Sequence, residues 1–169
     1  MTRRNIAVAS PIWVLIAGTT LLWGAVSALA GQTGQVWRTP SCGCCKAWVD
    51  HMQSKGFDLT ITDMPTTELG QKKIALGVGG ALTSCHTAAI GGYTIEGHVP
   101  AEDVERLLIE KPEAIGLSVP GMPAGSPGME MAERHDAFDV LLVNKDGTSS
   151  VFAHHAAPVP GGQSDSRGN

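Results

Sequence analysis

The sequence has few charged side chains and lacks the motifs of several common enzyme classes. Charged residues make up 17% of its 169 positions and aromatic residues 5%. There is no Ser/His/Asp signature, no phosphate-binding loop and no catalytic carboxylate pair, so neither hydrolysis nor phosphoryl transfer is indicated. Glycine (21) and proline (10) are plentiful instead, which is typical of one compact, loop-rich domain.

The N-terminal segment has the pattern of an export signal. Arg3 and Arg4 precede an uncharged apolar stretch over residues 6–26, and Ala28-Leu29-Ala30 offers a cleavage site. This order predicts a signal peptide over residues 1–30 and a periplasmic location. The alternative is an uncleaved membrane anchor, because the stretch is long enough to span a bilayer; only in that case is a membrane contact expected.

Positive charge is scarce in the rest of the chain. The predicted signal contains two arginines and no acidic residue, so residues 31–169 carry ten basic and sixteen acidic side chains, a formal net charge of −6. Without a basic patch, nucleic acid is excluded as an expected partner. Mild acidity suits an exported protein that attracts cations.

Hydrophobic periodicity predicts an alternation of strands and helices. Cys45, Trp48, Val49 and Met52 recur at helical spacing, and Gly91-Gly92 marks a tight hairpin. The predicted elements are a strand at 36–38, a helix at 43–55, a strand at 57–63, a helix at 66–76, a hairpin of strands 85–90 and 93–98, a helix at 101–110, a long Pro/Gly/Met loop at 116–131, and a second hairpin of strands 138–143 and 148–153.

This order predicts an α/β fold. The part up to the third helix (β-α-β-α-β-β-α) resembles a thioredoxin-like domain, to which the loop and the C-terminal hairpin are added. We expect this domain to span residues 31–155, and the Gly/Pro/Ser-rich tail at 156–169 to be disordered.

Three of the four cysteines, Cys42, Cys44 and Cys45, lie where the first strand passes into the first helix. Free N–H groups and a partial positive charge at a helix N-terminus favour thiolates, which bind metals and attack disulfides. Cys42 and Cys45 form a C-x-x-C pair that could close as a disulfide or chelate an ion. Cys44 is superfluous in a simple redox pair, and adjacent thiolates suit the bridging sulfurs of a cluster.

Cys85 completes the set. In a thioredoxin-like fold the turn before the third strand lies against the start of the first helix, so Cys85 is expected to face the other three cysteines. Four thiolates could hold one tetrahedral zinc ion, but the C-x-C-C spacing favours Cu(I) as a multinuclear copper–thiolate cluster. Two structural disulfides, and a thiol–disulfide oxidoreductase using Cys42 and Cys45, are the alternatives.

Other soft or borderline ligands are weaker candidates. His86 is expected to point away from the preceding cysteine, as alternate strand residues do. His98 could be a donor behind the metal ligands or a surface group, and the surface position is favoured. Met122 and Met129, in the Pro/Gly/Met loop, could shield or receive copper. His154-His155 resembles a short metal-binding tract at the start of the tail.

Several motifs, in order along residues 35–153, resemble the CopG-like family of periplasmic copper-resistance proteins. They are Thr39-Pro40-Ser41-Cys42-Gly43-Cys44-Cys45-Lys46, Ser84-Cys85-His86-Thr87, Ile95-Glu96-Gly97-His98-Val99-Pro100 and the run from Val119 to Glu130. The resemblance implies a thioredoxin-like domain with a cysteine-rich copper site. We therefore expect a metal-binding protein rather than an enzyme, with a redox role left open, whose partners are copper ions and a copper efflux or storage protein.

Overall fold

The structure, a computed structural model, describes residues 31–131 and 134–157, and the predicted signal peptide at 1–30 lies outside them. The predicted α/β class is confirmed. The elements are β1 (Thr33–Arg38), α1 (Gly43–Ser54), β2 (Asp58–Asp63), α2 (Thr66–Ala75), the 3₁₀ turn η1 (Gly80–Leu82), β3 (Thr87–Ile90), β4 (Tyr93–Glu96), α3 (Ala101–Glu110), β5 (Ala114–Ser118), β6 (Phe138–Asn144) and β7 (Ser149–His155).

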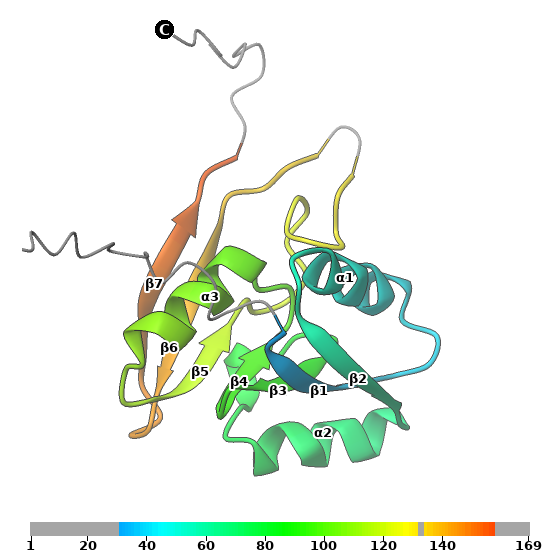
Figure 1. Cartoon of the computed structure of the whole chain (residues 1–169), viewed down its shortest axis with the longest axis horizontal. Coiled ribbons are helices and arrows are strands. Elements are labelled where there is room, and N and C mark those ends of the chain that lie inside the picture. The colour runs from blue at the N-terminus through cyan, green and yellow to red at the C-terminus, as the bar shows by residue number, and fades with distance from the viewer. Residues whose placement is uncertain (1–30, 132–133, 158–169) are drawn as a thin grey trace, which may run out of the picture.

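All the strands of the described part join one mixed sheet in the order β2-β1-β3-β4-β5-β6-β7 (Figure 1). β1 runs parallel to β2, β3 runs antiparallel to both β1 and β4, and β5 runs parallel to β4. The β6–β7 hairpin extends the sheet beyond β5. The sheet therefore has a strongly mixed topology, with β1 and β3 at the centre of its N-terminal half.

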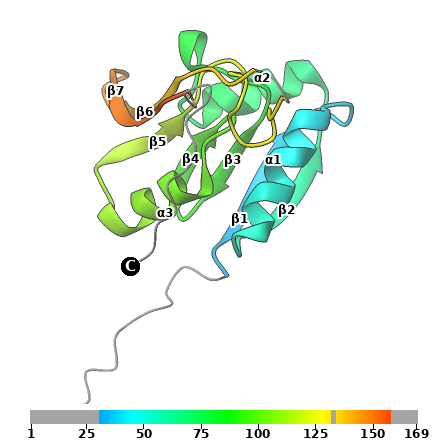
Figure 2. The same ribbon diagram turned by 90° about the horizontal axis from the view of Figure 1, so that it is seen from above.

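Helices cover both faces of this sheet. α1 and α3 lie on one face and α2 on the other, as the two views in Figures 1 and 2 agree. Between the sheet and the helices α1 and α3 lies a hydrophobic core. Its fully buried side chains include Trp48 and Met52 from α1, Val104 and Leu107 from α3, and Val36 from β1. Fully burying a side chain of this size contributes roughly 1.5–3 kcal/mol, so this face fixes α1 on the sheet.

One prediction about the loop is wrong in part. The sequence pattern predicts a loop from residue 116, but residues 116–118 belong to β5, which pairs in parallel with β4. The prolines that exclude a central strand begin only at Pro120, so the segment before them is free to pair. Gly116 is needed there, because a Cβ atom at this position would overlap the Thr94 backbone.

The first hairpin forms as predicted but begins two residues later. Thr87 opposes Glu96 and Ile90 opposes Tyr93, around the Gly91-Gly92 turn. Cys85 and His86 therefore precede β3 and are not held to the alternation of a strand. No helix in 31–131 or 134–157 is long and apolar enough to cross a membrane.

Candidate metal centre

Cys42 lies at the junction of β1 and α1 and caps the helix. Its Sγ atom accepts a hydrogen bond from the Cys45 N–H at 3.3 Å, which satisfies one of the free donors of the first turn. The helix then turns Cys45 into the core, where it is fully buried, while Cys42 and Cys44 remain partly exposed. The C-x-C-C spacing thus presents three sulfur atoms at one helix end.

The structure brings Cys85 to the same place, as the sequence predicts. Its Sγ atom lies 3.4 Å from that of Cys45 and 3.8 Å from that of Cys44, and the Cys42 and Cys44 sulfurs are 3.5 Å apart. All four sulfur atoms lie within 4.8 Å of one another, close enough to hold a metal ion. In this state Cys42 and Cys45 form a disulfide, and Cys44 and Cys85 are free thiols.

Two histidines lie against Cys85, and both expectations about them are wrong. His98 is fully buried rather than on the surface, with Nε2 3.0 Å from the Cys85 sulfur. His86 points toward Cys85, not away from it, with Nδ1 at 3.4 Å, because it precedes the strand. Cys85, His86 and His98 form a second group that could hold a metal ion and that shares a sulfur atom with the first.

The tautomer of His98 follows from its second contact. Its Nδ1 lies 2.8 Å from the Pro127 carbonyl oxygen, which can only accept a hydrogen bond, so Nδ1 carries the proton. Burial lowers the pKa of His98, and the neutral ring then offers the Nε2 lone pair to the Cys85 thiol. A backbone carbonyl that fixes the outer nitrogen in this way is typical of metal-ligating histidines.

Burial sets the protonation of the other groups. It raises the pKa of the Cys85 thiol to about 12, helped by repulsion from Cys44. Cys85 is therefore a thiol at neutral pH in the metal-free protein, and a metal that binds it as thiolate must release a proton. Burial also lowers the pKa of His86 well below its usual value, and its Nε2 atom has no hydrogen-bond partner within the described residues.

The Pro/Gly/Met loop lies against α1, where Figure 1 shows it in yellow. Gly128, at φ +84°, makes the close approach: a Cβ atom there would lie 2.7 Å from both the Cys44 carbonyl oxygen and the Trp48 backbone nitrogen. This contact brings the Pro127 carbonyl to His98. Met122 is 53% exposed, so its role as a copper ligand stays a prediction, as does that of Met129.

The His154-His155 tract lies apart from the cysteines. His154 is exposed and bonds Asp139 on the neighbouring strand, while His155 bonds Asp103 and stacks on Phe138. Both histidines end β7 rather than begin a disordered tail. The structure thus separates this tract from the four-cysteine group.

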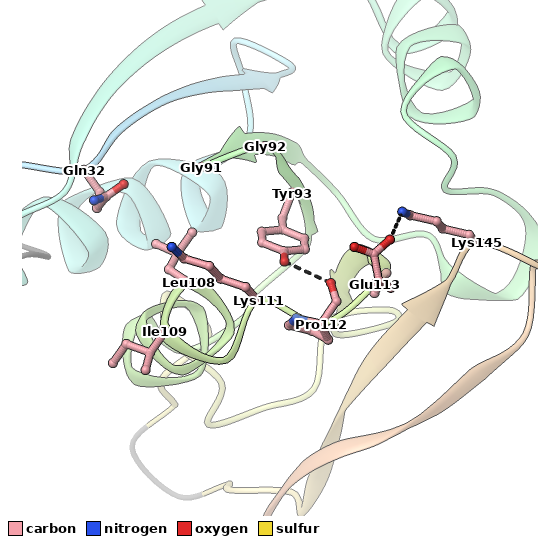
Figure 3. Close-up of a pocket in the computed structure, with 11 residues that line it drawn as sticks. Gln32, Gly91, Gly92, Tyr93, Leu108, Ile109, Lys111, Pro112, Glu113 and Lys145 are labelled. Carbon is pink, nitrogen blue, oxygen red and sulfur yellow. Dashed lines mark hydrogen bonds and ion pairs between the residues drawn. The ribbon is translucent and has the colours of Figure 1, made fainter.

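A pocket of about 900 Å³ lies at the other end of the sheet, beyond the β3–β4 turn (Figure 3). Tyr93 donates a hydrogen bond to the Pro112 carbonyl on one side, and Lys145 pairs with Glu113 on the other. Its lining contains no cysteine, histidine or methionine. The pocket has no donors for a soft metal, and the chemistry concentrates at the cysteines.

Fold and site together define an α/β protein with a cysteine cluster that could hold a metal ion. The sequence profile of DUF411, described as a protein of unknown function, matches residues 82–129. Two solved structures of the copper resistance protein CopG, Form 1 and Form 2, are each 41% identical to the chain with a TM-score of 0.69. The aligned part covers 75% of this chain and 99% of Form 1, and 74% and 98% for Form 2. No curated protein sequence matches. The chain belongs to the CopG family.

Proposed function

We propose that this protein is a periplasmic copper-binding protein of copper resistance and homeostasis that holds Cu(I) at Cys42, Cys44, Cys45 and Cys85. The observation that carries the proposal is the convergence of four sulfur atoms within 4.8 Å of one another, from two segments 40 residues apart. The two solved structures that are 41% identical to this chain are named as copper resistance proteins. The export signal predicted at residues 1–30 supports the location.

The donor set favours Cu(I) over other metals. Thiolates are soft ligands, which Cu(I) prefers, although zinc also accepts four of them. Adjacent Cys44 and Cys45 both approach Cys85, so the sulfur of Cys85 is placed to bridge two ions rather than to complete a single tetrahedron. His86 and His98 add nitrogen donors within 3.4 Å of the Cys85 sulfur. A multinuclear cluster uses all of these donors.

The disulfide state must be reduced before all four sulfurs can bind. An external dithiol supplies two electrons and two protons, opens the Cys42–Cys45 bond and is itself oxidised to a disulfide. As Cu(I) binds, the thiols lose their protons to solvent. The protein then lowers free copper, or passes it to an efflux or storage partner.

The strand arrangement supports the expectation of a thioredoxin-like domain. The N-terminal half has the order β2-β1-β3-β4, with β3 antiparallel to its neighbours, and helices on both faces. In such a domain the cysteines at the start of α1 and the turn before β3 meet at one end of the sheet. On this view the loop after β5, which brings the Pro127 carbonyl to His98, and the β6–β7 hairpin, which extends the sheet, are additions to that domain.

The second candidate function is thiol–disulfide exchange. It is favoured by one observation, the Cys42–Cys45 disulfide at the N-terminus of α1. In this reaction the two reduced cysteines would become a disulfide while a substrate disulfide became two thiols. Cys44 and Cys85, free beside the pair, are not required for it.

An anaerobic titration distinguishes the two functions. The reduced protein over residues 31–169, its Cys85→Ser variant and a His154→Ala control receive Cu(I), and bound copper is counted by elemental analysis. We expect more than one copper per chain in the wild type and the control, and a loss in Cys85→Ser. No copper uptake, together with dithiol-dependent disulfide reductase activity that survives Cys85→Ser, would instead support the exchange reaction.

A further inference from the structure

A buried ion pair lies directly behind the segment that carries Cys85. The Lys73 ammonium, on α2, is 2.6 Å from Glu96 Oε1 at the end of β4. The Lys73 side chain is 7% exposed and that of Glu96 is fully buried. Charged residues are rarely buried without a specific partner, and such a pair adds little to stability because both charges lose their hydration.

The same carboxylate oxygen holds the chain beside the metal centre. Glu96 Oε1 also accepts a hydrogen bond from the backbone N–H of Ser84, at 2.6 Å. Ser84 immediately precedes Cys85, and Glu96 lies two residues before His98. One oxygen thus fixes the position from which the Cys85 sulfur reaches its neighbours.

Other contacts keep this segment folded without reaching the Ser84 N–H. Ser118 donates to the Leu82 carbonyl at 2.6 Å, and the Gly121 N–H donates to the Thr83 carbonyl at 3.0 Å. The Ser84 hydroxyl donates to the Gly121 carbonyl. Removing the Glu96 contact should therefore shift Cys85 without unfolding the segment around it.

We propose that Glu96, held in place by Lys73, is a positioning residue that sets the Cys85 sulfur at the distance from Cys44 and Cys45 that the copper site requires. The inference rests on the copper-binding function proposed above. Lys73 neutralises and orients the buried carboxylate, and the carboxylate fixes the Ser84 amide. Neither side chain needs to touch the metal.

Two double variants separate this role from a structural one. Lys73→Met/Glu96→Leu removes the ion pair and the acceptor for the Ser84 N–H. Lys73→Met/Glu96→Gln removes the same charges but keeps a side-chain oxygen that can accept this bond. Apolar replacement of a buried pair is often neutral or stabilising, so the Leu variant should remain folded. Gln has the shape of Glu and keeps the bond to the Ser84 N–H, so the Gln variant should remain folded as well.

Copper affinity is measured in competition with a chromophoric Cu(I) chelator. A second readout, independent of copper, is the yield of Cys44–Cys85 cross-links formed by a short bis-electrophile in the metal-free disulfide state. We expect the Leu variant to bind copper about 10–100-fold more weakly, the usual effect of losing a contact behind a metal ligand, and to cross-link less. The Gln variant should match the wild type in both.

A further pair of variants removes the donor instead of the acceptor. Ser84→Pro deletes the N–H and leaves Lys73 and Glu96 intact, and Thr83 before it is already extended, as a residue preceding proline must be. Ser84→Ala, which loses only the hydroxyl, is its control. We expect the proline variant to behave as the Leu double variant does.

Equal copper affinity and equal cross-linking in the Leu and Gln double variants would overturn the positioning role. If the wild type itself bound no copper at the cysteines, the proposed function would fail. The cross-linking comparison would still decide whether Glu96 positions Cys85.

Discussion

Gly128 brings the Pro/Gly/Met loop onto the helix that carries three of the cysteines, and its replacement by alanine tests what this contact does. With φ at +84°, any side chain there costs about 1–2 kcal/mol in backbone strain. The new Cβ atom would also lie 2.7 Å from two backbone atoms of α1, which cannot rotate away. Overpacking of this kind typically costs about 1–3 kcal/mol more.

Gly147 provides a matched control. Its φ of +85° is nearly the same, but it lies in the β6–β7 turn and a Cβ atom there would meet nothing within 4 Å. Gly147→Ala should therefore lose about 1–2 kcal/mol, from strain alone. Gly128→Ala should lose about 2–5 kcal/mol, the sum of strain and overpacking. Urea unfolding of the metal-free protein measures both.

Copper binding gives the more specific readout. To relieve the overlap, the loop must move off α1, which carries the Pro127 carbonyl away from His98 Nδ1. His98 would no longer be held with Nε2 toward Cys85, and copper affinity should fall about 10–100-fold in Gly128→Ala and remain unchanged in Gly147→Ala. Equal losses of stability in the two variants, with copper affinity unchanged in both, would show that the close approach of Gly128 to α1 does not position His98.

Three further predictions concern the buried His51, the Cys42–Cys45 disulfide and the role of His98. His51 Nε2 accepts a hydrogen bond from the Ala101 N–H, and burial lowers the pKa of His51, so the folded protein prefers the neutral ring. The free energy of unfolding should therefore fall as the pH drops below the ordinary value of 6.5, less steeply in His51→Gln, whereas parallel pH profiles would exclude this contribution. Thiol counting on the denatured protein should give two free thiols after air oxidation, from Cys44 and Cys85, and four after reduction; four in both states would contradict the disulfide. His98→Ala should weaken copper binding roughly tenfold or more while His154→Ala leaves it unchanged, and equal affinities would remove His98 from the site.

Local patterns were sufficient for much of the fold and for the sulfur donors. The helical spacing of Cys45, Trp48 and Met52 predicts α1, and the Gly91-Gly92 turn predicts the β3–β4 hairpin. A two-residue turn also fixes the register of its strands. Carried outward from Ile90 opposite Tyr93, that register places Cys85 opposite His98, which is the signal that could have identified this histidine.

Other features depend on tertiary contacts that have no local signature. Lys73 follows Lys72 on α2, yet Lys72 lies over the Trp37 ring and Lys73 is buried against Glu96, 23 residues away. The side-chain direction of His86 could not be inferred because it depends on where β3 begins. The Pro127 carbonyl reaches His98 only because Gly128 allows two backbones to approach closely.

X-ray absorption at the copper edge, on the protein reduced and loaded anaerobically with Cu(I), shows directly whether a copper–thiolate cluster forms at the four cysteines. We expect a first coordination shell dominated by sulfur, a smaller nitrogen contribution that is lost in His98→Ala, and a short copper–copper distance from bridging thiolates. A shell of nitrogen and oxygen alone, or one isolated copper per chain with no copper neighbour, would contradict this expectation.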